Sequence, residues 1–310
     1  MSAAEESERD AMMVCASCGV AGSDDIKLKK CTACHLVRYC SVKCQKEHRP
    51  RHKKSCKKRA AELRDEILFK QPESSCFGEC PLCCVPLPID ESKSCLYACC
   101  SKYICNGCDH ANKLREREAR LPHTCPFCRK ALPKTRAECI ARLMKRIEAN
   151  DPAAMCNLGK DKKVEGDYKA AFEYWTKAVA LGDTEAHYHL SILYHNGEGV
   201  EKDEKRALYH TEQAAIGGHP EARYNIGCVE GNNGRIDRAA KHWIIGANLG
   251  CDGSLERVKT LYKGGDVSKE DFAATLRGHK AAIDATKSPQ REEVVAFAKW
   301  MRSIEGRGSN

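Results

Sequence analysis

Cysteine and histidine pairs crowd the first part of this chain at spacings that suit metal ions. Pairs this close can point both donor atoms at one ion from a tight turn, and sulfur and imidazole donors favour tetrahedral zinc. Between residues 15 and 56 there are four such pairs: Cys15 and Cys18, Cys31 and Cys34, Cys40 and Cys44, His52 and Cys56. Eight donors predict two zinc ions in this short stretch.

The four pairs can be shared between two ions in two ways. In an interleaved arrangement the first and third pairs hold one ion and the second and fourth hold the other; sequential pairing is also geometrically open. In both cases each ion has four protein ligands and no position for water, which makes the zinc structural rather than catalytic. Because the stretch has few apolar residues, metal binding must supply its folding energy, about 10–16 kcal/mol apparent per ion.

A second set of cysteines follows at the spacing of another two-ion module. Interleaving predicts one ion held by Cys80, Cys83, Cys105 and Cys108, and another held by Cys99, Cys100, Cys125 and Cys128. Three cysteines are left over, and Cys95 is the expected substitute if the adjacent Cys99 and Cys100 cannot both reach the metal. The expected cofactor is therefore structural Zn²⁺, four ions in all.

Cysteine usage also bears on the compartment. Eighteen of the 22 cysteines lie at or before Cys128, and the acidic residues 1–13 lack the apolar core of a secretory signal. No run approaches the roughly 18 apolar residues of a membrane span. We expect an intracellular protein, cytoplasmic or nuclear, that is not secreted and has no membrane partner. In a reducing compartment, cysteine pairs bind metal rather than form disulfides.

The net charge of +9 is concentrated between residues 27 and 70, with its densest run from Arg49 to Arg59. A basic run of this kind predicts either a nuclear import or nucleic-acid patch, or the solvated flank of a zinc finger. No aromatic residues interleave with the charge to stack on bases, which favours the solvated flank. A nucleic-acid partner is thus possible but not favoured.

The second half of the chain repeats itself. The segment 180–186 recurs at 216–222 and, more loosely, at 248–254, so that its glycine returns after 36 and then 32 residues. Periods of this length predict stacked helix pairs, which offer extended surfaces to partner proteins. Pro289 opens a last helix that we expect to seal the end of the stack with Val294, Val295, Phe297 and Trp300.

These observations predict a multidomain chain with two small cross-brace zinc-binding modules followed by an all-α solenoid of helix-pair repeats. The expected parts are a disordered acidic tail (1–13), a zinc finger (14–57), a helical linker (58–74), a second zinc module (75–133), a linker helix (134–150), the repeats (151–287), and a capping helix with a tail (288–310).

The first module resembles the MYND finger in its eight donors, in Tyr39 before Cys40, and in the run from Cys44 to Lys46. MYND fingers are protein-interaction modules that often grip proline-containing peptides. The resemblance implies a peptide contact at Gln45. The family's groove commonly has a tryptophan where this chain has Arg49.

The second module resembles an all-cysteine RING finger, a family that recruits a ubiquitin-conjugating enzyme through a shallow apolar groove. The resemblance places Leu82 and Pro126 in that groove, and puts Arg129 where many active members have a cation that touches ubiquitin. The repeats resemble Sel-one-like repeats, relatives of the tetratricopeptide repeat, most clearly from Tyr194 to Ala207.

The sequence shows no nucleophile–base pair, phosphate-binding loop or open metal site, so it predicts no catalytic residue. The favoured function is a zinc-binding scaffold or adaptor whose partners are proteins or peptides. One alternative is a RING-type ubiquitin ligase whose MYND finger and repeats select substrates. A third is a nuclear regulator that uses the basic run from Arg49 to Arg59.

Overall fold

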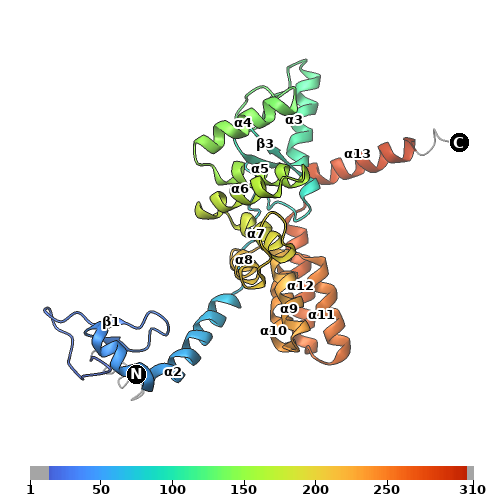
Figure 1. The fold of residues 1–310 in the computed structure, drawn as a ribbon. Helices are drawn as coiled ribbons and strands as arrows, with labels where there is room; N and C mark the ends of the chain where they lie inside the picture. The colour runs from blue at the N-terminus through green and yellow to red at the C-terminus, as the bar shows by residue number, and fades with distance from the viewer. Residues whose placement is uncertain (1–13, 306–310) are drawn as a thin grey trace. The chain divides into compact units, whose positions relative to one another are not determined.

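The computed structural model describes residues 14–305, and the chain divides between Lys70 and Gln71 into two compact units (Figure 1). The tail 1–13, expected to be disordered, lies outside the described residues. Among the helices that are described, none has the length and apolar character that crossing a membrane requires.

The first unit is a small sulfur-rich fold followed by a long helix. Strands β1 (Lys29–Lys30) and β2 (Arg38–Tyr39) pair antiparallel, and the buried core beside them is made of four cysteines and Tyr39. Helix α2 (Val42–Leu68) begins at Ser41, whose side chain accepts a hydrogen bond from the backbone N–H of Cys44 at 3.2 Å. This single helix crosses the boundary expected at residue 57, since it carries Cys44, His52 and Cys56 and continues beyond them to Leu68.

The second unit opens with the other cysteine-rich module. Its elements are a short 3-10 helix η1 (Glu91–Lys93), a hairpin of β3 (Ser94–Tyr97) and β4 (Lys102–Cys105), and helix α3 (Asn106–Glu118). Helix α3 is anchored by two buried carboxylates. Asp109 accepts a hydrogen bond from the Tyr97 hydroxyl, and Glu116 accepts two from Thr124, at 3.1 and 2.7 Å.

Ten helices follow within the described residues, and they form the solenoid with its flanking helices. Helices α5 with α6, α7 with α8, and α9 with α10 pack as antiparallel pairs (Figure 1). A glycine with φ near +90° ends the second helix of each pair, at Gly182, Gly218 and Gly250, where a side chain would be strained. The bounds are α4 (Arg136–Glu148), α5 (Pro152–Val164), α6 (Tyr168–Ala180), α7 (Thr184–Asn196), α8 (Glu204–Ile216), α9 (Pro220–Asn232), α10 (Ile236–Asn248), α11 (Asp252–Gly264), α12 (Lys269–Ala285) and α13 (Pro289–Glu305).

In two helix pairs the same kind of hydrogen bond, from an indole N–H to a backbone carbonyl, joins the two helices. In α6 the indole N–H of Trp175 donates to the carbonyl of Cys156 at 3.0 Å, and in α10 that of Trp243 donates to the carbonyl of Tyr224 at 3.2 Å. Each tryptophan stands sixteen residues after a glycine, Gly159 or Gly227, whose missing side chain makes room for the indole. The buried indoles therefore set the distance between the two helices of a pair.

The second zinc module is docked on the repeats. Ala98 of the hairpin shares a buried apolar cluster with Leu143 of α4 and Ala154 of α5. The Tyr103 hydroxyl donates to Asn157 Oδ1 at 2.7 Å, and Lys160 Nζ of α5 lies 3.0 Å from a Glu91 carboxylate oxygen. Helix α4, expected as a linker, is thus part of a shared core between the hairpin and the first repeat.

The last helix differs from the expected cap of the stack. Helix α13 packs against α3 of the zinc module, where the His110 and Phe297 rings lie 5.5 Å apart. Gly107 permits this contact, because a Cβ there would stand 2.8 Å from the backbone nitrogen of Arg291. Val295, Phe297 and Trp300, expected in the seal, are exposed at 45%, 46% and 56%.

Four histidines are packed among the repeat helices. His189 stacks on Trp175 with ring centroids 4.6 Å apart, and the Nδ1 atoms of His187 and His210 lie 2.9 Å apart. Burial lowers the pKa of all four histidines, to about 4 for His210 and about 3 for His219. Burial therefore keeps these rings neutral near pH 7.

Acidification is expected to destabilise the repeats through these rings. An unfolded histidine takes up its proton near pH 6.5, whereas folded His210 does so only near pH 4. Between these values the unfolded state binds more protons, so the free energy of unfolding falls as the pH falls. Urea unfolding at pH 7 and pH 5, followed by tryptophan fluorescence, measures this in the repeat half, because all three tryptophans lie at or beyond Trp175.

The matched variant is His210→Gln, which removes one of these titrating groups. It is needed because burial raises the pKa values of Asp183 and Glu185, and those groups change stability with pH in the opposite sense. We expect the variant to lose less stability than the parent between pH 7 and pH 5. An equal loss in both proteins would contradict a neutral, buried His210.

Candidate metal centres

The structure gathers the sixteen expected donors into four groups of four. Within each group the donor atoms all lie within 4.8 Å of one another. The groups follow the interleaved order: Cys15, Cys18, Cys40 and Cys44; Cys31, Cys34, His52 and Cys56; Cys80, Cys83, Cys105 and Cys108; Cys99, Cys100, Cys125 and Cys128. Sequential pairing, which the sequence left open, does not describe these groups.

The distances within the groups fit tetrahedral zinc. Zn–S bonds of about 2.3 Å at tetrahedral angles place two sulfurs about 3.8 Å apart. The Sγ atoms of Cys31 and Cys56 are 3.7 Å apart, and those of Cys100 and Cys125 are 3.8 Å apart. All 22 cysteines fall within the described residues and all are free thiols, so the short distances are not disulfides. The four groups fit structural zinc.

The adjacent cysteines of the second module both join the same group. The tight turn after β3 puts Cys99 Sγ 3.3 Å from Cys128 Sγ, while Cys100 Sγ faces Cys125. Cys95, the expected substitute, lies on the exposed side of β3 with its thiol 3.5 Å from Asn106 Oδ1. Adjacent residues can both contribute here because a turn, unlike a strand, does not send successive side chains to opposite faces.

The crowded thiols of one group differ widely in pKa. In the third group, the side-chain hydrogen bond from Cys105 lowers the pKa of Cys80 to about 4, while burial raises the pKa of Cys108 to about 12. Crowded thiols therefore cannot all ionise on their own. A bound divalent cation removes this conflict, because a coordinated thiol is deprotonated outright. Four such ligands leave no position for water or substrate, so these centres can hold a fold but not turn over a reaction.

Neighbouring side chains orient the donors. His52 presents Nε2 to Cys34 Sγ at 3.2 Å, and its other ring nitrogen lies 3.3 Å from the Ser55 hydroxyl. His48 stacks on His52 at 5.5 Å and meets the Tyr39 hydroxyl at 3.0 Å through Nδ1. Partners of this kind fix the orientation of a ligating histidine. Helical spacing from His52 is the signal that could have pointed to His48 and Ser55.

One contact to a candidate ligand comes from the far end of the chain. Arg291 of α13 donates to the backbone carbonyls of Pro86 and Val85, at 2.6 and 3.0 Å, and its Nη2 lies 3.7 Å from Cys83 Sγ. More than 200 residues separate Arg291 from Cys83, so the sequence held no signal for this contact.

The expected partner-binding residues differ in their exposure to solvent. Gln45 and Arg129 are exposed, and Arg129 reaches Asn112 Oδ1 at 3.5 Å. Leu82 is 40% exposed, whereas Pro126 is buried.

The fold and the centres together define a class: a zinc-binding protein with two cysteine-rich cross-brace modules and an all-α solenoid. The fold class and the zinc cofactor expected from the sequence are thereby confirmed.

Comparison with known proteins agrees with this class. The MYND finger family matches residues 15–56, and the Sel1 repeat family matches residues 152–183 and 184–219. "Chitin synthase regulatory factor 4" of Schizosaccharomyces pombe is 29% identical over 89 residues, which are 28% of this chain and only 14% of that protein.

Two solved structures align with part of this chain. A Sel1 repeat protein from Oxalobacter formigenes aligns with 57% of this chain and 74% of its own, at 20% identity and a TM-score of 0.43. A protective antigen of uropathogenic Escherichia coli with an SLR fold aligns with 48% of this chain and 33% of its own, at 25% identity and a TM-score of 0.39.

Proposed function

We propose that this chain is a zinc-dependent adaptor that holds different partner proteins on its finger and on its repeats. The observation that carries the proposal is the closed donor set of every centre: four protein donors surround each position, and all sixteen are supplied by the chain. Metal in such centres stabilises folds rather than reacting. MYND fingers and Sel1 repeats are both protein-interaction modules, and they account for 15–56 and 152–219 of this chain.

The proposal assigns one zinc ion to each of the four donor groups. Zinc would then have two tasks in the adaptor. In the finger it would hold the contact residue Gln45 in place on α2, and in the second module it would stabilise the hairpin that packs on α4 and α5. The expected parts, with boundaries near residues 57, 74, 133, 150 and 287, are on this view functional units rather than separately folded domains.

Affinity purification of the full chain from its native extract tests the adaptor. The Cys34→Ser variant removes one donor of the finger and is compared with the parent and with Cys95→Ser, whose thiol lies outside the four groups. We expect Cys34→Ser to lose one set of partners and keep another, and Cys95→Ser to keep both. If Cys34→Ser loses all of the parent's partners or keeps all of them, the finger and the repeats do not hold different partners.

The ligase alternative can be tested at Leu82, the exposed residue between the first two donors of the second module. If the module recruits a ubiquitin-conjugating enzyme, the zinc-loaded chain should ubiquitinate itself, and Leu82→Ala should reduce the rate at least tenfold because an apolar anchor is lost. Leu121→Ala is the control, since Leu121 is also exposed, at 51%, but follows α3. Absence of activity with a panel of conjugating enzymes would exclude this alternative.

The nuclear-regulator alternative depends on the basic run from Arg49 to Arg59. In the structure this run forms the middle of α2, with most of its basic side chains in solvent. A nucleic-acid partner would bind with an affinity that falls steeply as salt rises, because phosphate contacts release counterions. Lack of a mobility shift of DNA or RNA at low salt would remove this alternative.

A further inference from the structure

A groove lies between the second zinc module and the last repeats. Its volume is about 750 Å³, within the range of binding sites for small ligands and short peptides. One wall is lined by residues between Pro72 and Lys93, and the other is formed by the starts of α9 and α11 and the ends of α10 and α12. The groove exists only because the module is docked on the solenoid, so it belongs to neither part alone.

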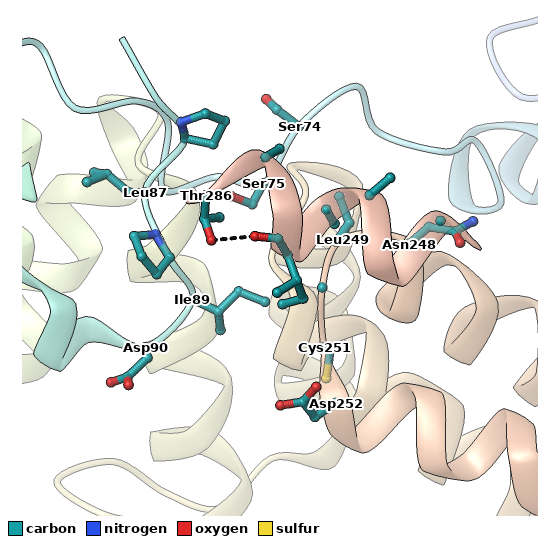
Figure 2. A pocket seen from close by; sticks show the side chains of 18 of the residues that line it. Ser74, Ser75, Leu87, Ile89, Asp90, Asn248, Leu249, Cys251, Asp252 and Thr286 are labelled. Carbon is teal, nitrogen blue, oxygen red and sulfur yellow. Dashed lines mark hydrogen bonds between the residues drawn. The ribbon is translucent and has the colours of Figure 1, made fainter. Parts of the chain in front are cut away.

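The floor of the groove is apolar. Ile89 extends from the zinc module into the groove, and Leu249, which follows α10, lies on the opposite wall (Figure 2). Ile283 of α12 also lines the groove. Gly250 lies between the two walls: a Cβ there would stand 3.5 Å from the Cδ1 atoms of both Ile89 and Ile283. Ile283 keeps 37% of its surface exposed, so this floor offers apolar contact to a ligand.

The rim of the groove is acidic although the whole chain carries a net charge of +9. Glu73, Asp90, Glu221 and Asp252 line it, against a single lysine, Lys93. Asp90 and Asp252 lie on the same side of Ile89 in Figure 2. Lys93 is already 3.5 Å from Asp90, so it does not neutralise the remaining carboxylates.

Glu221 has one carboxylate oxygen that lacks a donor. Its side chain is 37% exposed, but its Oε2 atom is buried and accepts no hydrogen bond from any residue that the structure describes. The nearest ring nitrogen, His219 Nδ1 at 3.3 Å, accepts a hydrogen bond from the backbone N–H of Ala222 and so carries no proton to donate. A buried acceptor without a donor is costly, and a ligand that brings a cation removes that cost.

We propose that this groove binds an extended peptide segment of a partner protein in which an arginine or lysine is flanked by apolar residues. The cation would pair with Glu221, and the flanking side chains would cover Ile89 and Ile283. This inference rests on the proposed adaptor function and names the chemistry of one of its partners.

Selection from a phage-displayed library of random nine-residue peptides tests the proposal on the full, zinc-loaded chain. We expect enrichment of peptides that place arginine or lysine beside leucine, isoleucine or proline. The best peptide, made with a fluorescent label, should bind Glu221→Gln at least tenfold more weakly, because a charge-assisted hydrogen bond is lost. Ile283→Ser should weaken it similarly, while Glu173→Gln, an exposed change on α6, should leave binding unchanged.

Zinc content and tryptophan fluorescence show whether each variant is folded. Of the two groove variants, Glu221→Gln removes a charge and Ile283→Ser removes an apolar contact. Enrichment of acidic peptides, or of none, would overturn the proposal. So would a peptide whose affinity is unchanged in both groove variants, because it must bind elsewhere, for example on the finger. In that last case the adaptor function would survive. The adaptor function itself would be refuted if affinity purification with the parent chain recovered no partner proteins.

Discussion

Removal of zinc from the full chain is expected to unfold residues 15–56 and 80–128 while helices α5–α12 stay folded. The core of the first module consists of Cys15, Cys31, Cys34, Cys44 and Tyr39, so apolar burial alone cannot replace the metal. Structural zinc contributes about 10–16 kcal/mol apparent per ion, more than the whole stability of many domains. The repeats instead bury Trp175, Leu190, Leu193 and Trp243 among packed helices and need no ion.

Hydrogen–deuterium exchange before and after chelation measures this difference along the chain. Backbone amides of the two zinc modules should exchange fast after chelation, and those of α5–α12 should keep their protection. Elemental analysis of the reduced parent should find four zinc ions per chain. Fewer than about three ions, or modules that stay protected after chelation, would refute structural zinc.

Cys99→Ser and Cys95→Ser form the matched pair for the second module. The two residues lie four positions apart, but only Cys99 has its sulfur within the fourth donor group. We expect Cys99→Ser to lose one zinc ion and protection of the β3–β4 hairpin, and Cys95→Ser to keep four ions. Equal zinc content in both variants would show that the donor assignment is incorrect.

The donor groups could be anticipated because their members are close in sequence. A pair such as Cys125 and Cys128 is brought together by one turn, and the interleaving of pairs is the only long-range information required. The roles of the adjacent Cys99 and Cys100 were harder to predict, since spacing alone left Cys95 as a substitute for one of them. The turn after β3 brings both Cys99 and Cys100 into the fourth donor group. The ligand assignment itself stays a prediction until the metal is measured.

The solenoid could be anticipated for a similar reason. Each repeat contacts mainly its neighbours, so a period in the sequence becomes a period in space. Helix α13 shows where this reasoning stops. Its apolar residues suit a cap, yet the helix packs against α3, because Gly107 allows close approach and Arg291 finds backbone acceptors in the zinc module. Neither contact has a local signal in the sequence.

The docking of the zinc module on the repeats could not be predicted from the sequence either. It depends on single polar contacts between distant residues, such as Tyr103 with Asn157, and on small apolar residues such as Ala98 and Ala154. These residue types occur everywhere in the chain and carry no spacing pattern. The groove that follows from this docking could therefore be recognised only in three dimensions.

A single methyl group at Gly227 is expected to destabilise the repeats by about 2 kcal/mol, within the range for overpacking a core. A Cβ there would stand 2.4 Å from the indole nitrogen of Trp243, closer than any real contact. The indole cannot move away freely, because its N–H donates to the carbonyl of Tyr224 and its ring is 6% exposed. Gly227→Ala must break that hydrogen bond or spread α9 from α10.

Gly231→Ala, one turn later in the same helix, is the matched control. A Cβ at Gly231 would stand 3.3 Å from the far edge of the same indole, a contact that a small shift relieves. Alanine also favours a helix over glycine by up to about 1 kcal/mol, so this variant should be neutral or slightly stabilising. Urea unfolding followed by tryptophan fluorescence compares the two. If Gly227→Ala proves as stable as Gly231→Ala, the indole does not set the spacing of the helix pair. The same role inferred for Trp175 at Gly159 would then also lose its physical basis.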